Sequence, residues 1–188
     1  MLDVALKFVT SELNGYLLSR TGADFGAAQL RRLVDDTGKC VLDIDHLGLA
    51  IVNLEEERTF KPQLPETTYL AGQNVVLEPK LLLHLHVLVV ANFTNYEEAL
   101  RYLSRVLTFF QAHPTFTPDQ YPGLDPRIEK LVVELQTLSY EQLNQMWAFV
   151  GGKQLPSAVY RIKLVALQDT TPLAIEPPIM RITTLVHA

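Results

Sequence analysis

The chain has 188 residues, of which 48% are hydrophobic and 20% are charged, and its formal net charge is −5. These values are typical of a globular domain and argue against an intrinsically disordered chain. The acidic balance, without a run of Lys or Arg, argues against a nucleic-acid partner, because binding nucleic acid requires positive charge to neutralise phosphates. Cys40 is the single cysteine, so an intrachain disulfide is excluded.

The N-terminal segment has charged residues within its apolar pattern, at Asp3, Lys7 and Glu12. It therefore lacks the uninterrupted apolar stretch of a signal peptide. The longest apolar run, residues 81–91, contains two histidines and is shorter than the roughly 20 residues of a transmembrane helix. We expect a protein that is cytoplasmic on synthesis and does not insert into a membrane.

The first third of the chain predicts one helix, a hairpin and a strand. Residues 2–17 place apolar side chains on one face of a helix, which Gly22 is expected to end. Residues 27–45 are interpreted as a hairpin, and residues 47–58 as a strand whose apolar half suits a central position in a sheet. Residues 59–78 contain two prolines and a glycine and predict a long loop, of a kind often used for contacts.

The middle of the chain has the strongest signals. Residues 81–91 alternate between two faces that are both largely apolar, which predicts a strand in the middle of a sheet. Asn95 and Glu98 resemble a capping box and open a predicted helix, which His113 and Pro114 end.

The segment that follows is ambiguous at first. Residues 128–138 alternate as a strand does, although Asp125 and Pro126 could begin a helix; we favour the strand. Residues 139–150 begin with a second capping box and predict a helix, and residues 157–168 predict a strand.

The C-terminal residues form a separate part of the predicted organisation. Residues 168–178 are a Pro-rich spacer that cannot continue a strand ladder, and residues 179–188 alternate like a strand. This last strand either folds back on its own sheet or adds to the open edge of a neighbouring subunit. Its candidate partner-interface residues are Ile179, Arg181, Thr183 and Leu185.

Together these elements predict an α/β (α+β) fold with a central mixed, mainly antiparallel sheet and about three helices packed on it. We expect an α/β domain over residues 1–167 and an extension over residues 168–188. Two aromatic residues, Tyr102 and Phe109, lie seven residues apart on the flank of the second helix. They either pack beneath the long loop or form an exposed aromatic strip at a subunit interface.

His84 and His86 form the pattern that most suggests a metal site. They lie on one face of the predicted strand, about 7 Å apart. A catalytic zinc generally requires three protein ligands, so we favour structural or interface histidines. Glu55 and Glu57 share a face and are interpreted as a solvated strand end with Arg58 as their ion partner.

No residue pattern indicates an active site. Cys40 has no local nucleophile signature and is interpreted as a small buried residue. The sequence contains no nucleophile elbow, phosphate-binding loop or dinucleotide fingerprint. We therefore assign no catalytic, cofactor-binding or metal-binding residue and no cofactor, and we expect a protein that is not an enzyme.

Four stretches, in order, resemble one family: "ALKFVTSELNGYL", "LAIVNLEEER", "LHLHVLVVANFTNYEEALRYLSRVLTFFQAHPTFTP" and "LDPRIEKLVVELQTLSYEQLNQMWAFVGGKQLPSAVYRIKLV". They are similar to the cap, or tail-terminator, proteins of extracellular contractile injection systems, which are phage-tail-like particles. The resemblance runs from about Leu2 to Leu167 and implies a tail-terminator-like fold. Residues 168–188 carry no motif of this family.

The resemblance implies a structural protein that forms a hexameric ring at the distal end of the inner tube and sheath. The ring would stop polymerisation and anchor the last sheath layer. The particle would be either released extracellularly or docked to a membrane by other subunits. The alternatives are a baseplate or adaptor subunit of the same particle, and a small metal-dependent enzyme that uses His84 and His86.

Overall fold

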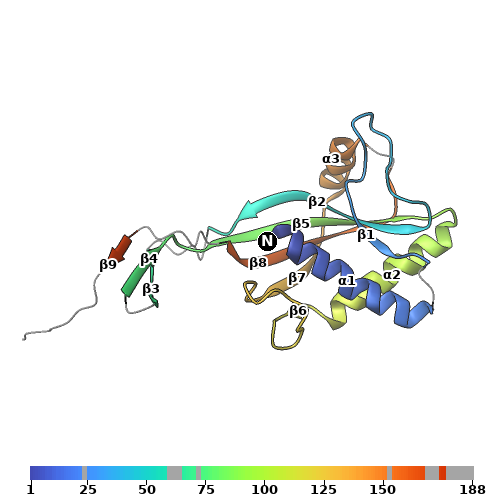
Figure 1. Cartoon of the computed structure of the whole chain (residues 1–188). Helices are drawn as coiled ribbons and strands as arrows, with labels where there is room; N and C mark the ends of the chain where they lie inside the picture. The colour runs from blue at the N-terminus through green and yellow to red at the C-terminus, as the bar shows by residue number, and fades with distance from the viewer. Residues whose placement is uncertain (23–24, 59–64, 71–72, 152–153, 168–173, 177–188) are drawn as a thin grey trace, which may run out of the picture.

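The computed structural model describes residues 1–22, 25–58, 65–70, 73–151, 154–167 and 174–176 (Figure 1). Its helices are α1 (Leu2–Thr21), α2 (Tyr96–Ala112) and α3 (Tyr140–Val150). Its strands are β1 (Ala28–Leu30), β2 (His46–Glu56), β3 (Glu66–Leu70), β4 (Gln73–Leu77), β5 (Leu81–Asn92), β6 (Thr115–Phe116), β7 (Leu131–Gln136), β8 (Ser157–Leu167) and β9 (Ala174–Glu176).

The main sheet has six strands in the order β1-β2-β5-β8-β7-β6. Only the β1–β2 pair is parallel among the described strands of this sheet, and its other neighbours are antiparallel. The predicted class, a mixed and mainly antiparallel sheet with about three helices, is confirmed. The strand predicted over residues 81–91 is β5, and it lies between β2 and β8 as expected for a central strand.

Alternate side chains of β5 enter two different cores. Leu85, Val87 and Val89 are buried against α1 and α2 on one face of the sheet. Leu88 and Val90 are buried on the opposite face, against α3 and the segment that precedes β2. Figure 1 shows this division, with α1 and α2 on one side of the sheet and α3 on the other. The strand is apolar on both faces because each face has its own cover.

The ends of α1 and α3 follow the sequence signals closely. α1 stops at Gly22, which has a φ of 68° and donates its backbone N–H to the Leu18 carbonyl. α3 begins with a complete capping box: Ser139 Oγ accepts the Gln142 N–H at 3.2 Å, and Gln142 Oε1 accepts the Ser139 N–H at 2.9 Å. Gly151, at a φ of 73°, ends α3. Gly suits both ends because the left-handed conformation is strained for other residues.

The start of α2 differs in detail from the predicted capping box. Asn95 Oδ1 accepts the Glu97 N–H at 2.9 Å, so the N-cap forms. The Glu98 carboxylate instead accepts a hydrogen bond from Arg101, one turn further along the helix. His113 ends the helix as predicted.

The hairpin predicted over residues 27–45 is mostly absent from the described structure. Its turn is present, and a single antiparallel bridge joins Val34 to Cys40. The first strand, β1, pairs in parallel with β2 instead. One reason is Asn14 on α1, whose side chain donates to the Ala28 carbonyl at 2.9 Å and accepts the Ala28 N–H at 2.6 Å. These two hydrogen bonds satisfy the backbone N–H and carbonyl groups of Ala28 on the side that faces α1, and β2 is the strand that pairs with β1.

β2 is central over only part of its length. β1 pairs with Leu47, Gly48 and Leu49, and the described residues include no strand beside the later half of β2 on that edge. Ile51 and Leu54 are consequently 42% and 47% exposed. The central position predicted for the apolar half of this strand, Leu47–Leu54, holds for Leu47–Leu49, which pair with β1, and is wrong for the apolar residues that follow.

The long loop predicted over residues 59–78 is wrong, because it contains the β3–β4 hairpin. β9 pairs with β4 and completes a three-stranded sheet, although its residues lie in the expected spacer. Two features explain the difference. Only residues 71–72 separate β3 from β4, a connection short enough for a tight hairpin. Pro172 and Pro177 flank β9 without interrupting it. Figure 1 shows this small sheet beyond the start of β5, away from α2 and α3.

Candidate interaction surfaces

His84 and His86 contact the two carboxylates of the neighbouring strand segment. His84 Nε2 lies 3.2 Å from Glu57 Oε2, and His86 Nε2 lies 3.3 Å from Glu55 Oε2. The contact between His86 and Glu55 has the distance of an ion pair, but its atoms are not aligned for a hydrogen bond. The sequence suggested Arg58 as the partner of this acidic run, whereas the structure places histidines there. The missed signal is the antiparallel pairing of β2 with β5, which brings the end of one strand beside the start of the other.

Basic residues lie on the other side of the histidines. Arg161 and Lys163 on β8 stand opposite His86 and His84 in the strand register. Both reach Glu134 on β7: Arg161 Nη2 donates to Oε2 at 2.6 Å, and Lys163 Nζ lies 2.8 Å from Oε1. The Lys163 and Arg161 donors lower the pKa of Glu134. Polar groups thus run across four neighbouring strands: carboxylates at the end of β2, histidines on β5, basic residues on β8 and Glu134 on β7. Such pairing of opposite charges and hydrogen-bonding groups across strands stabilises a sheet.

The same arrangement bears on metal binding. Within the described ranges, no group of three or more His, Cys, Asp or Glu residues is placed to hold a metal ion. Each histidine has one carboxylate beside it and a basic residue on its other side, which disfavours a cation. Cys40 is exposed, so its interpretation as a buried residue is wrong.

Among the described residues, no helix is both long enough and apolar enough to cross a membrane.

Tyr102 and Phe109 are core residues, at 2% and 3% exposure. The Tyr102 hydroxyl donates to the Phe25 carbonyl at 2.7 Å, and its ring stacks on Phe93 with the centroids 4.8 Å apart. Phe109 packs against Tyr16 of α1, with the centroids 5.3 Å apart. The expected exposed aromatic strip is therefore wrong for the single chain. The alternative cover, the predicted long loop, is also wrong, because α1 and the segment that follows it cover these rings.

The candidate interface residues of the C-terminal segment, Ile179, Arg181, Thr183 and Leu185, lie outside the described residues.

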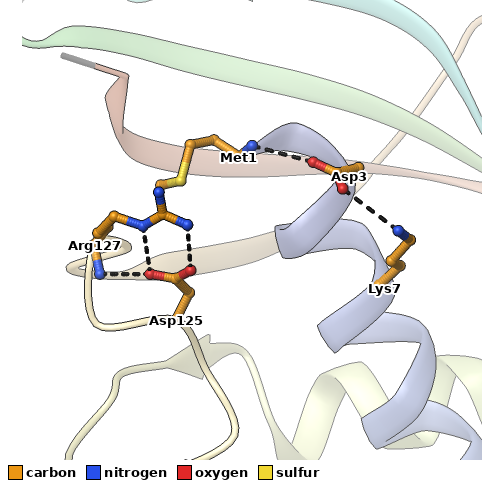
Figure 2. A network of polar contacts seen from close by, with 5 residues as sticks. All are labelled: Met1, Asp3, Lys7, Asp125 and Arg127. Atoms are coloured by element: carbon orange, nitrogen blue, oxygen red, sulfur yellow. Dashed lines mark hydrogen bonds and ion pairs between the residues drawn. The ribbon is translucent and has the colours of Figure 1, made fainter. Parts of the chain in front are cut away.

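Two groups of polar contacts lie near each other, one within the connector between β6 and β7 and one at the start of α1 (Figure 2). The Asp125 carboxylate accepts three hydrogen bonds from Arg127: from the backbone N–H at 2.9 Å, from Nε at 3.0 Å and from Nη2 at 2.7 Å. These donors lower the pKa of Asp125 to about 2. Asp3 accepts from the Met1 amino group at 3.1 Å and from Lys7 Nζ at 3.4 Å. The contacts between Asp125 and Arg127 order the connector, whose Leu124 and Ile128 enter the core.

The exposed apolar side chains form the surfaces that the sequence did not reveal. Phe149 on α3 is 79% exposed, and Leu107 on α2 and Leu135 on β7 are 38% and 55% exposed. Leu135 alternates with two buried residues of β7, so its pattern predicts burial. It remains exposed because two hollows, of about 420 and 280 Å³, open beside it between α2, β7 and α3. Tyr160 lines the larger hollow, and burial raises its pKa.

The fold and these surfaces define an α+β domain that has internally paired polar groups and exposes apolar side chains over α2, β7 and α3. The chain belongs to the Pvc16 N-terminal domain family, whose model matches residues 7–181. This match confirms the family resemblance seen in the sequence. No curated protein sequence matches the chain.

Two solved structures share the fold. One is the sheath/tube terminator, in its extended state, of PVC, an extracellular contractile injection system; it has a TM-score of 0.65 and 12% identity over 96% of this chain and 62% of that chain. The other is the tube-terminating cap of the anti-feeding prophage, with a TM-score of 0.62 and 13% identity over 95% of this chain and 60% of that chain. The tail-terminator-like fold is thereby confirmed. The chain spans about three fifths of the length of either structure.

Proposed function

We propose that this chain is a structural assembly protein that caps the distal end of the tube and sheath of a contractile injection system. It stops polymerisation and anchors the last sheath layer. The observation that carries the proposal is the fold match to two terminators over 96% and 95% of the chain, together with the family match over residues 7–181.

The physical argument concerns how polymers end. A tube and a sheath grow by head-to-tail contacts that do not close on themselves. A ring with one matching face and one face that matches nothing ends such growth. Each subunit then needs a large contact surface rather than a catalytic pocket. The charged residues described above are paired within the chain, which supports a scaffold and a role that is not enzymatic.

The proposed partners are other copies of the chain in a hexameric ring, the inner tube and the sheath. The proposed division is a terminator-like domain over residues 1–167 and an extension over residues 168–188. The extension supplies a partner contact through Ile179, Arg181, Thr183 and Leu185.

Electron microscopy of particles with and without the protein tests the proposal. The purified protein should form hexameric rings, alone or on tube ends, and a label on it should mark the end far from the baseplate. Deletion should give tubes and sheaths of uncontrolled length, because nothing stops their growth. A strictly monomeric protein whose deletion leaves both lengths unchanged would contradict the proposal. A label at the baseplate end would favour an adaptor role instead.

A further inference from the structure

Phe149 is an unusual residue for the helix that carries it. α3 packs on the sheet through Leu143, Met146 and Trp147, yet Phe149 is 79% exposed on the flank of the helix. Glu141 is the single charged residue in α3, and it lies in the first turn. A large apolar side chain on a charge-poor surface is typical of a contact site between proteins.

A groove elsewhere on the chain can receive such a side chain. We define the α2–β7 groove by Leu103, Leu107 and Phe110 of α2 together with Val133 and Leu135 of β7. Its two hollows, of about 420 and 280 Å³, share Leu107 and Leu135. A cavity of about 150 Å³ is enough to bind benzene, so either hollow has room for a phenyl ring.

The groove is open because the sheet ends there. β6 pairs only with Leu131 and Val132, and no other described strand covers the rest of β7 on that edge. The groove is also poor in free charge. Glu134, on the opposite face of β7 from Leu135, is held by Arg161, and the rim beside Leu107 carries the neutral side chain of Gln111. Depletion of charge at the centre of a contact is the compositional signature of interfaces.

We propose that Phe149 of one copy inserts into the α2–β7 groove of the next copy and that this contact joins the subunits of the ring. Phe149 lines neither hollow of its own chain, so the projection and the groove are separate features of each copy. Both surfaces are charge-poor, which makes each a suitable partner for the other. A contact between two different patches repeats around an axis and can close a ring. The inference rests on the proposed ring and identifies the surfaces that build it.

Disulfide trapping between copies tests the geometry. In a Cys40→Ser background, which removes the single thiol, Gln145→Cys places a thiol one turn before Phe149, and Gln111→Cys places one on the groove rim. Phe149 and the groove leucines stay intact in both variants. Mixed under mild oxidation, the 145 and 111 variants should cross-link to each other faster than either cross-links to itself. A Lys7→Cys variant mixed with Gln111→Cys serves as the control. If the 145 and 111 variants cross-link to each other no faster than this control pair, the proposed contact is wrong.

Substitution of Phe149 tests its contribution. Phe149→Ala should weaken self-association at least about 30-fold, as truncation of a central aromatic anchor does, whereas Phe149→Leu should retain most of it. Sedimentation measures the association. Because Phe149 is exposed in the single chain, both variants should keep the wild-type melting temperature at protein concentrations where all three proteins are monomeric, which separates lost contact from misfolding.

Two outcomes separate this contact from the proposed function. If Phe149→Ala self-associates and caps tubes like the wild type, the contact is wrong and the capping function stands. If the wild type does not self-associate but Phe149→Ala detaches from tube or sheath ends, Phe149 binds the polymer. The contact between copies is then overturned.

Discussion

Tyr102 packs directly over Gly26, where the chain turns back toward β1. Gly26 has a φ of 78°, and a Cβ added at this position would overlap the Tyr102 ring. Gly22, at the end of α1, has a similar φ of 68° but has open space around its Cβ position. Substitution of Gly22 therefore measures the cost of backbone strain alone, whereas substitution of Gly26 measures that cost together with the cost of close packing. The position of Tyr102 on a helix flank did not reveal its burial, because Phe25, whose carbonyl accepts its hydroxyl, is 77 positions away in the sequence.

The alanine variants of these glycines should differ in stability. Gly22→Ala should cost about 1–2 kcal/mol from the left-handed backbone alone. Gly26→Ala should cost about 2–5 kcal/mol, because it adds the displacement of a packed ring to the same strain. Chemical denaturation of the two variants measures the difference. Equal losses would show that Tyr102 can move aside without cost.

At the scale of elements, local signals decided what the sequence could predict. α1, α2 and α3 have apolar stripes and end signals, and β5 and β8 have long alternating runs, so all five were predictable from nearby residues. β1 was assigned the wrong partner because its pairing depends on a side-chain contact with Asn14 of the preceding helix, which the pattern of β1 itself does not show. β3, β4 and β9 are short, and their pairing with one another defines them more than their composition does.

The candidate surfaces were less predictable than the fold. His84 and His86 were placed correctly on one face, but their carboxylate partners come from the register of β2 against β5. Phe149 and the groove around Leu135 could not be identified, because exposure depends on how far the neighbouring elements extend. A strand pattern predicts which face a residue occupies, but not whether another element covers that face.

The pairing of β7 with β8 should give stability that depends on pH. Lys163 and Arg161 lower the pKa of Glu134 in the folded protein. A lowered carboxyl pKa contributes stability above the unfolded value, and this contribution is lost as the pH falls through the folded value. Glu134→Gln should therefore lower the melting temperature by a few degrees at pH 7, consistent with a partly exposed pair worth at most about 1 kcal/mol.

The difference in melting temperature between Glu134→Gln and the wild type should shrink as the pH falls below about 4. In this range the unfolded carboxyl group becomes protonated first, and the folded one, whose pKa is lower, follows. Thermal melts from pH 7 to pH 3 measure this gap. Asp119→Asn removes an exposed carboxylate from a turn and serves as the control, with little effect expected at any pH. A gap for Glu134→Gln that stays constant across this range would show that lost packing, rather than charge, explains the effect.

At the scale of the whole molecule, the small sheet of β3, β4 and β9 lies apart from the two hydrophobic cores. Among the residues whose side chains are described, those that build the two hydrophobic cores run as far as Ile162, and β9 pairs with β4 in the small sheet. Figure 1 shows this small sheet apart from the helices that cover the main sheet. A subunit that ends a polymer needs one surface for its ring neighbours and another for the polymer. The separation of the small sheet from the α2–β7 groove is suited to that division.

Two truncations test whether the extension acts on partners. A chain that stops after Glu176 keeps all the described strands, and one that stops after Gln168 also loses β9 and its pairing with β4. Both should fold with nearly the wild-type melting temperature, because neither removes a described core residue. The chain ending at Glu176 should nevertheless fail to restore tube and sheath length in particles that lack the protein. The chain ending at Gln168 should show in addition faster amide exchange in β4. If the longer truncated chain unfolds, residues 177–188 belong to its own core, and if it caps normally, those residues make no essential partner contact.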